Sequence, residues 1–136
     1  MRTFLISLVS PETLLFADQV QRVDLPGVEG DFGVLTGHAP IVALLRPGIL
    51  TVVTGDARER FVVLGGLAEF SNEQLTVLAE EAFAAQDFDL SEFKMRIDEM
   101  QQSLALKSTG DELDQAVVQL DHYKSIHEAL TLTAAI

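Results

Sequence analysis

Hydrophobic and polar positions alternate over short stretches in the first 86 residues. Phe4, Ile6 and Leu8 share one face of an extended segment that ends before Pro11, and a second such segment covers 20–25. Further short apolar runs lie at 49–53, 61–64 and 75–79. Many short strands at close spacing, with no helical pattern between them, predict an antiparallel β-sandwich or barrel.

Turn-forming residues separate these runs and set the expected strand ends. The Pro26-Gly27 pair and the 30–33 stretch have turn chemistry, and the 54–56 stretch is expected to form a hairpin turn. Arg46-Pro47-Gly48 is expected to divide the apolar run after Pro40 from the strand at 49–53, and Gly65-Gly66 to end the strand at 61–64.

The pattern changes to a helical period after residue 86. From Asp87 onward there is no proline and only one glycine, Gly110. Apolar residues recur at intervals of three and four and form one helical stripe, and Asp89 with Glu92 resembles a capping box. The residues of this stripe are Leu90, Phe93, Ile97, Met100 and Leu104.

A second helix is expected after a short link at 107–110, where Thr109 and Glu112 offer another N-terminal cap. Its apolar face comprises Leu113, Ala116, Val117, Leu120, Tyr123, His127 and Leu130. Two amphipathic helices joined by a short link predict an antiparallel helical hairpin. We therefore expect two domains: a β domain over 1–86 and a helical hairpin over 87–136, with His127 packed inside the hairpin and His122 facing solvent.

Composition narrows the classes of partner. The 136 residues carry a net charge of −12, divided evenly as −6 before residue 87 and −6 from residue 87 onward. Such a surface repels phosphate backbones and anionic headgroups, so neither nucleic acid nor direct membrane binding is expected. The chain has no cysteine and no apolar run long enough to span a bilayer, which predicts a soluble protein of the cytoplasm.

No constellation of side chains predicts catalysis, a cofactor or a metal. His122 and His127 are five residues apart, which places them about 140° apart around a helix rather than on one face. The paired acids at 80–81 and 111–112 are adjacent, and those at helix starts are explained by the helix dipole. Gly65-Gly66 lacks the lysine and hydroxyl of a phosphate loop, and no serine has nucleophile-elbow spacing.

His38 remains a special position, because Gly37 and Pro40 restrict the backbone around it. Its ring either caps this turn through hydrogen bonds or forms part of a contact with a partner. On the residues alone, three functions stay open: a subunit that needs a protein partner, a sandwich that binds a small ligand in an apolar pocket, and an enzyme of unrecognised type.

A set of ordered motifs resembles the ε subunit of F-type ATP synthases, whose mitochondrial counterpart is called δ. The motifs are Leu25-Pro26-Gly27, Glu29-Gly30-Asp31-Phe32-Gly33, Gly37-His38-Ala39-Pro40, Pro47-Gly48, Gly65-Gly66 and Val77-Leu78-Ala79. They cover the N-terminal region, whereas the helical hairpin matches by architecture rather than by motif. The resemblance implies an N-terminal β-sandwich followed by a two-helix hairpin.

The resemblance further implies a non-catalytic rotor subunit of the central stalk. Such a subunit binds γ and the c-ring below the catalytic α/β head, couples rotation to ATP synthesis, and reaches the membrane only through the c-ring. Its expected location is the cytoplasmic face of the bacterial inner membrane. By resemblance, the interface with the c-ring and γ comprises Glu29, Gly30, Asp31, Phe32, Gly33 and His38, and no cofactor is expected.

The hairpin departs from part of the family pattern. Some relatives inhibit ATP hydrolysis with basic residues of these helices, but here four basic residues face ten acidic ones, so we expect at most weak inhibition. Other relatives bind ATP at an Asp-x-x-Arg-Ala stretch. Here Glu92 replaces that arginine within 89–93, which predicts that ATP binding is lost.

Overall fold

The computed structural model describes residues 2–104, 106 and 110–135 of the chain. Contacts within the chain divide it into two compact units, Met1–Asp87 and Phe88–Ile136, one residue later than the expected division. The first unit contains eight strands and the second contains two helices. The predicted fold class, a β-sandwich followed by a helical hairpin, is confirmed.

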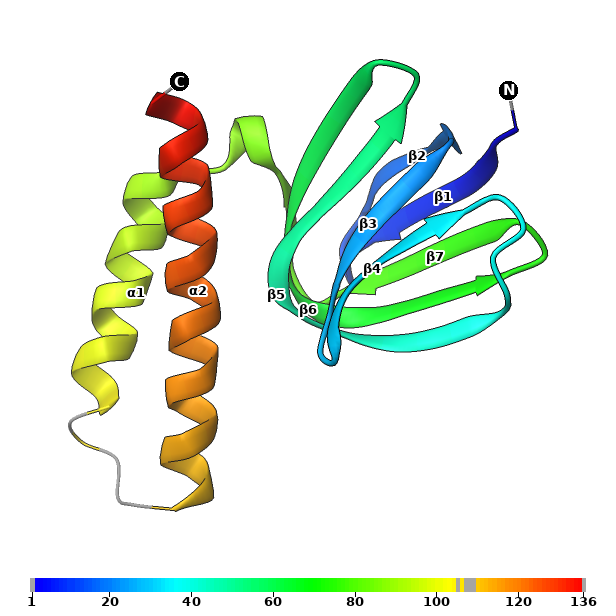
Figure 1. Cartoon of the computed structure of the whole chain (residues 1–136). Coiled ribbons are helices and arrows are strands. Elements are labelled where there is room, and N and C mark those ends of the chain that lie inside the picture. The colour runs from blue at the N-terminus through cyan, green and yellow to red at the C-terminus, as the bar shows by residue number, and fades with distance from the viewer. Residues whose placement is uncertain (1, 105, 107–109, 136) are drawn as a thin grey trace. The chain divides into compact units, whose positions relative to one another are not determined.

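The strands of the first unit form a continuous sheet that folds over into two layers (Figure 1). Its order is β2-β1-β7-β6-β5-β3-β4. The short strand β8 lies off this path and pairs with residues 61–63 of β6. All pairs are antiparallel except β1 with β7, which is parallel. The strands are β1 (Phe4–Val9), β2 (Leu14–Val20), β3 (Arg22–Gly27), β4 (Gly30–Leu35), β5 (Ile41–Thr54), β6 (Ala57–Ser71), β7 (Gln74–Ala79) and β8 (Ala82–Ala84), and a 3₁₀ turn, η1 (Ala85–Asp87), follows.

Two long strands replace the short ones that the sequence predicts at 49–53 and 61–64. β5 runs through Arg46-Pro47-Gly48 and β6 runs through Gly65-Gly66, so both expected strand breaks are wrong. Pro47 lies where the pairing of β5 with β3 shifts register, and proline is tolerated at such an irregularity. The 30–33 stretch is likewise the start of β4 rather than a turn.

The core of the sandwich follows from the alternation in the sequence. Phe4, Ile6 and Leu8 of β1 are fully buried, and Phe4 packs edge-on against Phe70 of β6 with ring centroids 5.5 Å apart. No charged or polar residue of the described chain is fully buried. The stability of this unit therefore comes mainly from apolar burial between the two layers.

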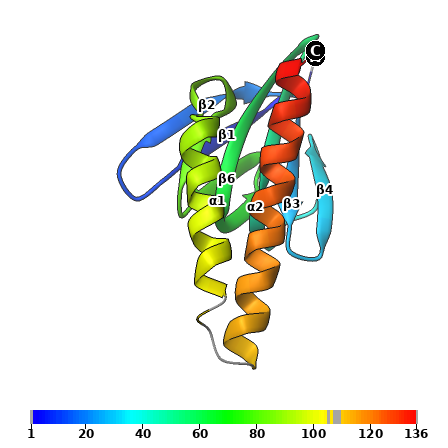
Figure 2. The same ribbon diagram turned by 90° about the vertical axis from the view of Figure 1, so that its left-hand side faces the viewer.

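The second unit consists of α1 (Leu90–Leu104) and α2 (Asp111–Ala135), which run side by side in opposite directions (Figures 1 and 2). The side chain of Asp89 accepts a hydrogen bond from the Glu92 amide at 3.0 Å, as the capping pattern predicts. Phe93 stacks on Tyr123 with centroids 5.1 Å apart, and the Arg96 guanidinium lies 5.4 Å from the same Tyr123 ring. An aromatic layer thus joins the two helices.

Burial within the hairpin differs in part from the predicted stripes. Phe93, Ile97 and Leu120 are buried, whereas Leu90, Met100, Leu104, Leu113 and His127 are half-buried. Val117 is 40% exposed, so its expected packing inside the hairpin is wrong, and Ile126 is buried instead. His122 is half-buried rather than facing solvent. The expected cap at Thr109 lies outside the described residues.

Neither helix combines the length and the hydrophobicity that a membrane crossing requires, in the part of the chain that the structure describes.

Candidate partner-binding site

The predicted interface residues begin at a tight turn between β3 and β4. Gly27 pairs with Gly30, so that Val28 and Glu29 form a two-residue turn. Gly30 has a φ of +131°, and a Cβ on Gly27 would lie 2.6 Å from the Gly30 carbonyl oxygen. Glycine is therefore required on both sides of the turn, and this geometry places Glu29 at its tip.

Arg46 of β5 holds the two ends of this turn together. Its Nη1 donates to the carbonyl oxygen of Gly27 at 2.6 Å, and its Nη2 contacts a carboxylate oxygen of Asp31 at 2.5 Å. Asp31 is thus neutralised within the molecule. In the described part of the chain, Glu29 has no ion-pair partner. Of the two acids predicted to attract a partner, only Glu29 presents an uncompensated charge.

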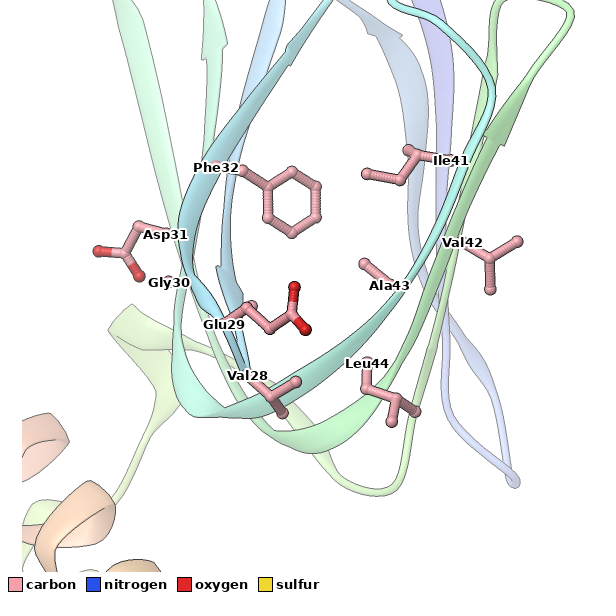
Figure 3. A pocket seen from close by; sticks show the side chains of 10 residues that line it. Val28, Glu29, Gly30, Asp31, Phe32, Ile41, Val42, Ala43 and Leu44 are labelled. Atoms are coloured by element: carbon pink, nitrogen blue, oxygen red, sulfur yellow. The ribbon is translucent and has the colours of Figure 1, made fainter.

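A cup with a volume of about 530 Å³ opens between this turn and the first half of β5 (Figure 3). Figure 3 shows that Phe32, Ile41 and Ala43 point into the cup and that the Glu29 carboxylate lies among them. Its lining residues are Gly27, Val28, Glu29, Gly30, Asp31, Phe32, Ile41, Val42, Ala43 and Leu44. A mostly apolar cup with one carboxylate suits a side chain that has an apolar stem and a cationic end.

The structure places His38 and Gly33 outside this cup. His38 lies on the loop between β4 and β5, where its Nδ1 donates to the Ala39 carbonyl oxygen at 2.6 Å and its ring packs edge-on against Phe70. Gly33 lies beside the Arg22–Asp24 ion pair, where a Cβ would approach the Asp24 carboxylate to 3.1 Å. The predicted interface therefore occupies several neighbouring surfaces of the sandwich rather than one site.

A second exposed feature, absent from the predicted site, crosses the outer face of the sheet. Cross-strand pairing aligns Leu44 with Leu67, Leu67 with Leu78, Leu78 with Val9, and Val9 with Leu14. Directly paired residues share one face of a sheet, so these five residues form a continuous apolar row. Leu44 is 62% exposed and Leu78 is 50% exposed.

A signal for this apolar row exists in the sequence. Positions 41–45 are all apolar, and alternate residues of a strand point to opposite faces, so this part of β5 had to expose apolar side chains unless both faces were covered. The partners of Leu44 on β6 and β7 could not be found this way, because they depend on the pairing register.

The described residues contain no group of three or more His, Asp or Glu side chains that could hold a metal ion. The candidate site in the described part of the chain therefore consists of two surface features: the cup, which contains the unpaired carboxylate of Glu29, and the apolar row. Surfaces of this kind bind other proteins.

Comparison with known proteins agrees with this geometry. Residues 3–85 match the family model described as ATP synthase, Delta/Epsilon chain, β-sandwich domain. The chain is also 62% identical over 135 residues to the ATP synthase epsilon chain 2 of Nitrobacter hamburgensis, covering 99% of both chains. The chain belongs to the ATP synthase delta/epsilon chain family.

The likeness to other ATP synthase epsilon chains extends through the helical hairpin. An ATP synthase epsilon chain from Rhodopseudomonas palustris is 55% identical over 134 residues, or 98% of each chain. A chain in the structure titled Euglena gracilis mitochondrial ATP synthase, OSCP/F1/c-ring, has the same fold, with a TM-score of 0.74 at 22% identity over 97% of this chain and 81% of that one. As an epsilon chain, this protein is a stalk subunit of ATP synthase, a membrane-associated complex, and not its catalytic subunit.

Proposed function

We propose that this epsilon chain is the rotor subunit that links γ to the c-ring in a proton-translocating F-type ATP synthase, and that it thereby couples rotation to ATP synthesis. The observation that carries the proposal is the apolar row on the outer face of the sandwich. Soluble monomers rarely expose large contiguous apolar patches, and a patch of this kind marks a protein interface. Family membership makes γ the expected partner for it.

The energetics of the apolar row favour a stable attachment. Covering a leucine that is otherwise exposed contributes roughly 1.5–3 kcal/mol, before the entropic cost of association is subtracted. Leu44, Leu78 and Leu14 are each at least half exposed, so they have most of their surface available for burial against γ. A rotor subunit needs an attachment that persists under torque, which a broad apolar contact supplies.

The cup beside the β3–β4 turn suits the c-ring. Polar loops that carry a basic side chain would place an apolar stem against Phe32 and Ile41 and a positive charge beside Glu29. Because Arg46 already neutralises Asp31, Glu29 is the residue that selects for positive charge. The sandwich would then contact γ through the apolar row and the c-ring through the cup, two adjoining surfaces that share Leu44, at the cytoplasmic face of the bacterial inner membrane.

We propose at most a weak regulatory role for the helical hairpin. Four basic and ten acidic residues lie from position 87 onward, so close contact with acidic segments of the α/β head would be repulsive. Glu92, at the start of α1, would also repel a nucleotide phosphate at the position where some relatives have arginine.

The cup also favours a second candidate function, the binding of a small cationic ligand. Its volume and its single carboxylate among apolar groups match the general character of ligand pockets. NMR titration of the full chain with alkylamines tests this alternative. Saturable shifts confined to the cup would support it, and unperturbed spectra at millimolar amine would exclude it.

Substitutions in the apolar row test the rotor proposal. Leu44→Ser and Leu78→Ser should each weaken binding to a complex of γ and the α/β head about tenfold or more, because each removes apolar area from the contact. Val118→Ser provides the matched control, since Val118 is 54% exposed but belongs to α2 and not to the row. Unchanged affinity for both leucine variants, measured by calorimetry, would contradict the proposal.

A further inference from the structure

The turn between β6 and β7 adopts a backbone conformation that its sequence does not favour. Ser71 pairs with Gln74, and the two residues between them, Asn72 and Glu73, have φ values of 52° and 57°. A two-residue hairpin turn with both φ values positive is of the type that prefers Asn followed by Gly. Asn72 fits this preference. Glu73 carries a steric cost that glycine would avoid.

The side chain of Glu73 makes a contact that glycine could not make. Its Oε1 accepts a hydrogen bond at 2.8 Å from the backbone amide of Gly37, which is 36 residues away in the sequence. Its own carbonyl oxygen accepts from the Leu5 amide of β1 at 3.2 Å. The β6–β7 turn is thereby tied to β1 and to the segment that carries His38.

That segment, residues 35–40, is here termed the His38 loop. It is closed by a hydrogen bond from the His38 amide to the Leu35 carbonyl oxygen at 3.1 Å, and Gly37 within it has a φ of +85°. The Thr36 hydroxyl is buried and has no hydrogen-bond partner among the described residues. The carboxylate of Glu73 is thus the side-chain acceptor that fixes the backbone of this loop from outside.

The His38 loop leads directly into the surfaces assigned to partners. Ile41, which follows the loop, lines the cup, and Val42 and Leu44 come next on β5. The His38 ring rests edge-on against Phe70 at a centroid distance of 5.9 Å, so a displaced loop would also displace the ring. The Glu73 carboxylate therefore contacts the loop that leads into these surfaces.

We infer that Glu73 is a positioning residue for the partner surface, and that backbone strain in its own turn is retained because its carboxylate fixes the His38 loop. The inference rests on the proposed function, since it takes this loop to contact γ or the c-ring. An observed left-handed residue that makes a long-range contact at a functional surface is the pattern expected of such stored strain.

Replacing Glu73 by glycine separates stability from binding. Glu73→Gly removes both the steric cost of the positive φ and the side-chain hydrogen bond, so the thermal midpoint of the full chain should stay the same or rise. Solvent exchange of the Gly37 amide, measured by NMR, should become at least about fivefold faster. Affinity for an ATP synthase complex stripped of this subunit should fall roughly five- to tenfold, the effect of one lost hydrogen bond.

Three further variants serve as controls. Glu73→Gln keeps a neutral acceptor and should restore most of the Gly37 protection and most of the affinity. Asn72→Gly alters the other residue of the turn and leaves the hydrogen bond between Glu73 and Gly37 in place, so it should change neither the Gly37 exchange nor the affinity. Gln21→Ala removes a bond of the same kind from another turn, where Gln21 Oε1 accepts from the Gly55 amide at 2.5 Å, and should leave affinity unchanged.

The outcomes distinguish this inference from the proposed function. Unchanged Gly37 exchange in Glu73→Gly would overturn the positioning role, whatever the affinity. Faster exchange with unchanged affinity would overturn the link between the His38 loop and the partner, while leaving the rotor proposal intact. Failure of the wild-type chain to bind the stripped complex would overturn the proposed function itself, and with it the partner contact inferred for the loop.

Discussion

At the scale of single residues, close backbone approach explains several of the glycines that mark this family. A Cβ on Gly48 would lie 2.5 Å from the Pro26 Cβ, and a Cβ on Gly66 would lie 2.3 Å from the Leu78 carbonyl oxygen. Neither neighbour is a flexible side-chain end that could turn away. Gly48 is therefore needed where β5 packs closely against Pro26 of β3.

Substituting Gly48 tests this account of the glycines. Gly48→Ala should reduce the free energy of unfolding by about 1–3 kcal/mol, because the added methyl group overlaps Pro26. Gly33→Ala is the matched control, since its Cβ would meet only side-chain ends, the Asp24 carboxylate at 3.1 Å and the Arg22 guanidinium at 3.7 Å. We expect it to cost less than about 1 kcal/mol in the same urea titration. Equal losses for the two variants would contradict the packing argument.

At the scale of elements, the sequence predicted β1, β3, β7 and both helices, but it predicted no strand at β2, β4 or β8 and misplaced the ends of β5 and β6. Alternation located the buried face of β1, and the intervals of three and four located α1. Glycine and proline were mistaken for strand ends in β5 and β6, because their effect depends on neighbouring strands that a local pattern does not contain. Gly65, with a φ of +91°, bends β6 without ending it.

The candidate site was predictable to a similar extent. The glycine turn around Glu29 could be found from its residues. The neutralisation of Asp31 by Arg46 could not, because it joins residues 15 positions apart on β4 and β5, which both pair with β3. The apolar row and the contact of Glu73 with Gly37 likewise depend on register and on loop packing, which a single sequence does not specify.

Within the hairpin, the burial of a side chain, rather than its place in the helical period, decides how much it contributes to stability. Ile97→Ala should lower the free energy of unfolding of the second unit by about 2–4 kcal/mol, since Ile97 is buried between the helices. Val118→Ala should cost less than about 0.5 kcal/mol, because Val118 is exposed. Helical circular dichroism followed through thermal unfolding provides the comparison, and equal shifts would contradict this assignment of the hairpin core.

At the scale of the whole molecule, the chain combines a unit that carries the proposed contacts with a helical unit that has a core of its own. Both the apolar row and the cup lie in Met1–Asp87. The hairpin core contains its own aromatic layer. The rings of Phe88 and Phe93 have centroids 4.9 Å apart, and Phe93 stacks on Tyr123. Assembly into the stalk is therefore expected to depend on the sandwich.

Removal of residues 88–136 tests this division of roles. The truncated chain should still restore coupling to a stripped ATP synthase complex, and ATP hydrolysis by that complex should change less than about twofold, because an acidic hairpin is repelled from acidic partners. The full chain is the control in the same hydrolysis and proton-pumping assays. A severalfold rise in hydrolysis on truncation would show that the hairpin inhibits.

Site-specific photo-crosslinking tests the rotor proposal most directly, since the chain contains no cysteine and accepts single labels cleanly. Leu78→Cys, Glu29→Cys and Asp56→Cys place a cysteine-linked benzophenone in the apolar row, at the cup and in the exposed β5–β6 turn, respectively. In native membranes we expect position 78 to crosslink to γ, position 29 to the c subunit, and position 56 to neither. Labelled complexes that stay intact and active but give no product with γ or c from positions 78 and 29 would contradict the central claim.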